Sequence, residues 1–78
     1  MNVLKCLGDV IGLYESGSLH AAESLERGVL TTLERSARPE NRIAFDHLSR
    51  PCSDLSEKLV ALRAANSYLS GVYVRRDR

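Results

Sequence analysis

The chain has 78 residues, enough for one small domain, and its eleven basic and ten acidic residues leave a formal net charge of +1. This near-neutral balance predicts no general attraction to nucleic acid or to an anionic membrane. A core of this size rarely supplies more than about 3–5 kcal/mol without a staple or a partner. Cys6 and Cys52 fall several helical turns apart if the chain folds back near Pro39, so we expect two reduced thiols, as in the cytoplasm.

The N-terminal stretch MNVLKCLGDVIGLY places Lys5 before apolar residues, as a signal peptide does. Asp9 interrupts that stretch, no convincing cleavage site follows it, and it is far shorter than the ~20 residues that span a bilayer. We therefore expect a helix here, without a secretion signal or a membrane span. The apolar residues that share one face of this helix are Leu4, Leu7, Ile11 and Tyr14.

Two stretches of turn residues divide the chain. In ESGS, Gly17 fits a helix C-cap and Ser18 a new N-cap, which predicts a break or kink near 16–18. In SARPEN, Arg38 precedes Pro39 and is biased away from helix, so we expect the main turn at 36–41, with Pro39 opening the next helix or completing the turn. Between the two turns, one helical face carries Leu19, Ala22, Leu25, Val29 and Leu33.

The second half carries the most regular pattern. Side chains recur there at alternating spacings of three and four, which is a heptad seam with a single polar member, Asn66. The seam consists of Phe45, Leu48, Cys52, Leu55, Leu59, Leu62, Asn66, Leu69 and Tyr73. Four acid–base pairs at i,i+4 support the helical period: Glu23–Arg27, Glu34–Arg38, Asp46–Arg50 and Asp54–Lys58.

No useful length alternates with period two, so the predicted fold class is all-α. We expect residues 1–78 to form a single small domain, an antiparallel helical hairpin with or without a short extra N-terminal helix. Its predicted core combines part of the apolar face at 19–33 with most of the heptad seam. These residues are Leu25, Val29, Leu33, Phe45, Leu48, Leu55, Leu59, Leu62, Asn66, Leu69 and Tyr73.

Pro51 conflicts with one unbroken second helix, because a proline in a helix interior costs about 3 kcal/mol. Either the helix kinks near 51, or a short helix ends at Ser49 and the main one begins at Pro51. The heptad phase runs through the proline unchanged, which favours the kink.

The last helix has a second apolar seam, about 100° around from the first, formed by Ala61, Ala65, Tyr68 and Val72. One antiparallel neighbour covers one seam, so the second needs a third helix, a second copy or another protein. A self-sufficient three-helix bundle is the plainer interpretation. The interpretation that we favour makes this second seam the partner-binding surface. Asn66 fits either a buried position that fixes register or a solvated edge.

The residues predict no enzyme, no metal site and no cofactor. His20 and His47 lack a second ligand-type residue at metal spacing, and Cys52 is most simply a buried seam residue. No nucleophile elbow or phosphate-binding loop is present. Arginines gather at 35–42 and 75–78, but a hairpin places these at opposite ends, so we expect no nucleic-acid interface.

The layout resembles the small helical needle co-chaperones of bacterial type III secretion, the YscE/SsaE/EscE-like group. The resemblance covers roughly residues 19–76 and consists of a leucine-rich helix ending in TLERSARPEN and a second helix closing on LVALRAANSYLSGVYVRR. Pro51 and the apolar N-terminal segment depart from the pattern of that group.

The resemblance implies a bacterial cytoplasmic protein without catalytic chemistry. Members of the group bind a larger helical-repeat chaperone and help to keep the needle subunit from polymerising. The alternative functions are a small helical transcriptional regulator and a self-associating three-helix adaptor.

Overall fold

The structure is a computed structural model that describes the backbone of residues 1–76 and the side chains of residues 1–73. The described residues form four helices and no strand: α1 (Val3–Glu15), α2 (Leu19–Arg35), α3 (Pro39–Leu48) and α4 (Leu55–Arg76). The all-α fold class is therefore confirmed, and the N-terminal segment is a helix of its own. The arginine-rich tail lies outside the described side chains.

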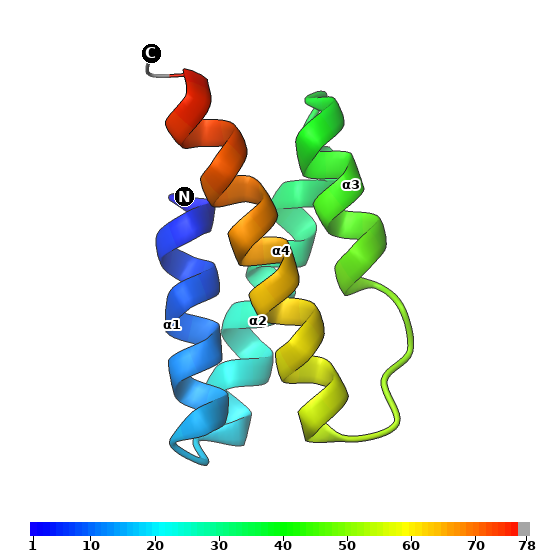
Figure 1. The fold of residues 1–78 in the computed structure, drawn as a ribbon. Coiled ribbons are helices and arrows are strands. Elements are labelled where there is room, and N and C mark those ends of the chain that lie inside the picture. Colours follow the sequence, from blue (N-terminus) through cyan, green and yellow to red (C-terminus); the bar gives the residue numbers. More distant parts are fainter. Residues whose placement is uncertain (77–78) are drawn as a thin grey trace.

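The helices form an up-down-up-down bundle in which each helix packs against the next one along the chain, and α1 also packs against α4 (Figure 1). The bundle measures 36 × 20 × 20 Å. Its core takes side chains from every helix, and six of the largest are fully buried: Leu7, Val10, Val29, Leu33, Leu62 and Leu69.

The first turn follows from Gly17, which has a φ of +83°. The backbone N–H of Gly17 donates to Tyr14 and that of Ser18 donates to Leu13, at 3.2 and 2.9 Å. This Schellman arrangement ends α1 and satisfies its last carbonyls. The break expected near 16–18 is therefore a true helix end, and α1 turns back to pack along α2.

The main turn lies where the sequence predicts it, because α2 ends at Arg35 and α3 opens with Pro39 at its first position. Proline suits that position, since the first turn of a helix leaves backbone N–H groups without helical partners. Arg38 has an extended backbone, with φ −77° and ψ 130°. Asn41 then donates from its side-chain amide to Ser36 Oγ across the turn, at 2.9 Å.

The favoured interpretation of Pro51, a kink in one continuous helix, is wrong. The helix ends at Leu48, and residues 49–54 form a loop before α4 begins at Leu55. Asp54 caps α4 by accepting the N–H of Glu57, and Glu57 in turn accepts hydrogen bonds from the N–H and hydroxyl of Ser53. These two bonds hold the pKa of Glu57 below its usual range. The loop separates two antiparallel helices that a kink would have kept in line.

Candidate functional site

The second seam of α4 is only partly on the surface. Ala65 is 1% exposed and belongs to the core, whereas Tyr68 is 39% exposed. Ala61 and Val72 are half-buried between these extremes. The prediction that Ala65 binds an outside partner is therefore wrong, because α1 and α3 flank α4 and enclose that side of the helix.

The predicted hairpin core also needs one correction. Leu55 is 41% exposed, because it opens α4 beside the 49–54 loop. Cys52 lies in that loop and is half-buried, as it is no longer part of a helical seam. The other predicted core residues are buried or half-buried: Leu25, Val29, Leu33, Phe45, Leu48, Leu59, Leu62, Asn66, Leu69 and Tyr73.

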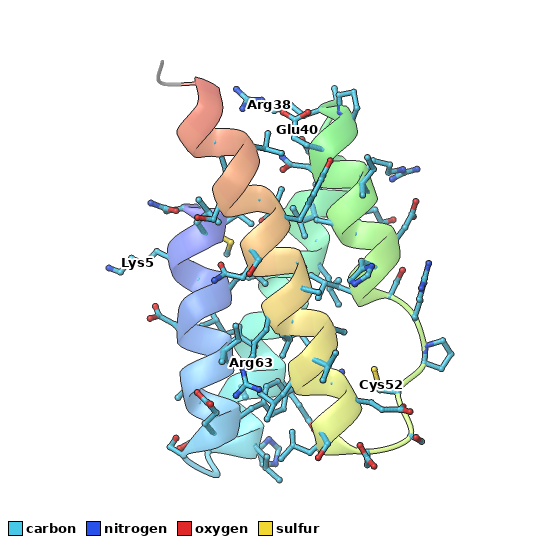
Figure 2. The ribbon with its side chains drawn as sticks, viewed as in Figure 1. Lys5, Arg38, Glu40, Cys52 and Arg63 are labelled. Atoms are coloured by element: carbon cyan, nitrogen blue, oxygen red, sulfur yellow. The ribbon has the colours of Figure 1, made fainter. Side chains whose placement is uncertain are left out.

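Asn66 is half-buried, and its Oδ1 is buried without a hydrogen-bond donor among the described residues. It lies one turn after Arg63, which reaches toward α1 and pairs with Glu15 (Figure 2). A partner amide that would fix register is not present in the described part of the chain. The alternative in which Asn66 fixes register therefore lacks its partner. A polar contact between helices is found elsewhere, where the hydroxyl of Tyr73 donates to Asn41 Oδ1 at 2.8 Å and joins α4 to α3.

Below the end of α3 the bundle has only three helices, and a groove opens between α2, α4 and the 49–54 loop. In Figure 1 this loop swings away from the bundle before it reaches the lower end of α4. The groove has a volume of about 670 Å³. Its apolar lining includes Leu19, Leu30, Leu48, Pro51, Cys52 and Leu55.

Three polar side chains from three helices meet at the floor of this groove. The Tyr14 hydroxyl donates to Glu26 Oε1, and Lys58 Nζ lies 3.1 Å from Glu26 Oε2 and 3.4 Å from Oε1. Glu26 is 7% exposed and Tyr14 4% exposed. Burial, followed by the hydrogen bond to Glu26 and its negative charge, raises the pKa of Tyr14 well above its ordinary value. The buried carboxylate is therefore satisfied by a neutral phenol and an ammonium group.

Sequence reasoning missed this polar cluster. Glu26 occurs four residues after Ala22 and three before Val29, which places an acidic residue on the buried face of α2. That spacing was the available signal. The predicted pairing of Asp54 with Lys58 is replaced by the longer-range pairing with Glu26, since Asp54 caps the helix instead.

The described residues contain no group of three His, Cys, Asp or Glu side chains that could hold a metal ion. His20 is exposed and His47 half-buried, on different helices. None of the described helices combines the length and the apolar composition needed to cross a bilayer.

Two surfaces therefore stand out: the outward side of α4 around Tyr68, and the groove over Glu26.

No protein-family model, curated protein or solved structure matches this chain.

Proposed function

We propose that this chain is a protein-binding subunit whose outward side of α4 packs against a larger partner. The observation that carries the proposal is the scarcity of charge along the middle of α4. Between Leu59 and Tyr73 the only charged residue is Arg63, and it is already paired with Glu15. A helix at the surface of a bundle normally turns a charged side to water.

The exposed residues on this side are apolar or small. Val60 is 65% exposed and Tyr68 39% exposed. Ile43 of α3 is 53% exposed, and the Tyr73–Asn41 bond places it within about one helical turn of Tyr68 along the antiparallel pair. Tyrosine is enriched among the residues that dominate binding energy at interfaces, where its truncation can cost about 2 kcal/mol.

The resemblance to needle co-chaperones supplies the nature of the partner. On this proposal the chain acts in the bacterial cytoplasm, binds a larger helical-repeat chaperone through Val60 and Tyr68, and helps to keep the needle subunit of a type III secretion system from polymerising. The half-buried Ala61 and Val72 lie at the edge of the contact. The mechanism is occlusion of apolar surface and needs no chemical step.

The test is binding of purified chain to the helical-repeat chaperone and needle subunit of its own host, measured by size-exclusion chromatography with light scattering. We expect Val60→Asp and Tyr68→Ala to abolish the complex while the helical circular dichroism of the isolated chain is kept. Ala21→Asp, an exposed substitution on α2, is the matched control and should bind normally. Absence of a complex with the unmodified chain, or equal binding by Val60→Asp, would refute the proposal.

A further inference from the structure

Two arginine-rich stretches meet at one end of the bundle. A hairpin that turns at 36–41 would put residues 75–76 at the far end of its second helix. The structure instead has α3 and the 49–54 loop between that turn and the last helix, so α4 runs back and ends beside the start of α3 (Figure 1). The bond from the Tyr73 hydroxyl to Asn41, at 2.8 Å, joins these two helix ends. The expectation that the two stretches lie at opposite ends is therefore wrong.

This end carries a local excess of positive charge. The last turn of α2, the 36–38 turn, the first turn of α3 and the last turn of α4 hold five arginines and two glutamates, a formal net charge of +3. The rest of residues 1–76 holds five basic and seven acidic side chains, a net charge of −2. The seven residues of this arginine-rich end are Arg35, Arg38, Arg42, Arg75, Arg76, Glu34 and Glu40.

The near-neutral charge of the whole chain does not cancel this excess. The bundle is 36 Å long, whereas the Debye length at physiological salt is about 8 Å. An anion at the arginine-rich end is therefore largely screened from the acidic side chains at the other end. The two residues that follow α4, Asp77 and Arg78, add one charge of each sign and leave the balance unchanged.

The arginines whose side chains are described are exposed, namely Arg35, Arg38 and Arg42. None of them takes part in an ion pair between described side chains. Glu34 is also exposed, whereas Glu40 is 8% exposed. Guanidinium groups bind phosphate with two parallel hydrogen bonds, so this set of side chains suits a ligand with several phosphates.

Aromatic rings and a hollow lie beside the same arginines. Arg38 Cζ lies 6.0 Å from the centre of the Tyr73 ring, and Arg42 Cζ lies 5.8 Å from that of Phe45. A hollow of about 420 Å³ opens next to Tyr73, and its lining includes Arg38 and residues 1–4. Unpaired bases stack on aromatic rings and on guanidinium planes. The arginine-rich end therefore combines groups for phosphate with a place for a planar base.

We propose that the arginine-rich end binds single-stranded nucleic acid. Arg35, Arg38 and Arg42 bind phosphates of neighbouring nucleotides, and one unpaired base enters the hollow beside Tyr73 and stacks on Arg38. The site uses neither Val60 nor Tyr68, so it is separate from the function proposed above.

The geometry favours a single strand over a duplex. The arginines come from the ends of three helices, so they do not form a row along one helix that would lie in the major groove. A duplex also keeps its bases paired and offers none to the hollow. An acidic peptide or an anionic membrane would meet the positive charge but would leave the hollow without a planar ring.

The probe is a fluorescein-labelled 12-nucleotide single strand of mixed sequence, and its binding is followed by fluorescence anisotropy. We expect saturable binding that weakens about twentyfold between 50 and 200 mM NaCl, because three phosphate contacts give a salt slope of about −2. The same strand annealed to its complement should bind about fivefold more weakly, because it offers no unpaired base.

The double variant Arg35→Glu, Arg38→Glu should weaken binding of the single strand about tenfold and flatten the salt slope by about 1.4, while the helical circular dichroism is kept. The matched control Arg27→Glu, Arg50→Glu changes the net charge equally at exposed sites that line the groove over Glu26. It should bind within about twofold of the unmodified chain. If the first double variant loses its helicity, the single variant Arg42→Glu replaces it in the same comparison.

Four results would overturn the proposal: no saturation up to about 1 mM, tighter binding of the duplex, equal weakening by the two double variants, or a salt slope near zero. Two competitors identify another occupant. Displacement by a 12-residue polyglutamate as effective as by unlabelled single strand would assign the end to an acidic protein segment. Displacement of that strength by phosphatidylcholine vesicles with phosphatidylserine would assign it to a membrane, and either result would refute the proposal.

Discussion

The two halves of the bundle are closed in different ways. In the half that contains α3, four helices surround Leu33, Ala44 and Leu69, which are each 1% exposed or less. In the half that contains the 49–54 loop, three helices surround a buried carboxylate, and Leu19 and Leu55 remain exposed. One half is therefore closed by apolar packing together with the hydrogen bond between Tyr73 and Asn41, and the other relies on a polar cluster where a helix is missing.

The largest expected effect comes from truncating matched leucines of α4 in the two halves. Leu69→Ala should lower the free energy of unfolding by about 2–5 kcal/mol, because it leaves a cavity among fully buried side chains. Leu55→Ala should lower it by less than about 1 kcal/mol, because that side chain is already partly in water. Urea unfolding followed by circular dichroism measures both, and equal losses would contradict the difference between the halves.

A smaller effect is expected from the polar cluster. Lys58→Met keeps the apolar stem but leaves Glu26 with Tyr14 alone, so it should destabilise the chain by about 1–3 kcal/mol. The lower end applies if water screens the pair, since the Lys58 side chain is 34% exposed. Adding Glu26→Gln to this variant should recover part of the loss in the same urea experiment. A double variant less stable than Lys58→Met would show that the carboxylate needs no cationic partner.

The smallest effect is a loss of stability in alkaline solution. The raised pKa of Tyr14 keeps its phenol neutral in the folded chain, whereas an unfolded tyrosine ionises near pH 10. The stabilisation is therefore complete below about pH 10 and is lost as pH rises toward the folded-state pKa, by up to about 1.4 kcal/mol per pH unit. Urea unfolding between pH 9 and 11 should show this slope, and Tyr14→Phe should have a shallower one. Parallel slopes would exclude Tyr14 as the cause.

Local sequence was sufficient for the helices and their ends. Gly17 needs the left-handed backbone that ends α1, and Pro39 suits the first position of α3, so both turns could be placed from residue types alone. The periodic apolar spacing likewise predicted an all-helical chain. These features depend on neighbours within about one helical turn, which a single sequence contains.

The tertiary structure decided which helical faces are inside. The unchanged heptad phase across Pro51 suggested a continuous helix, but the chain reverses there and Leu55 moves from core to surface. Ala65 is buried because α1 packs beside α4 as a separate helix and completes the ring. Glu26 likewise pairs with Lys58, 32 residues away, because the bundle brings these two side chains together. Such pairings depend on where whole helices lie, and periodicity records only that a helix has an apolar side.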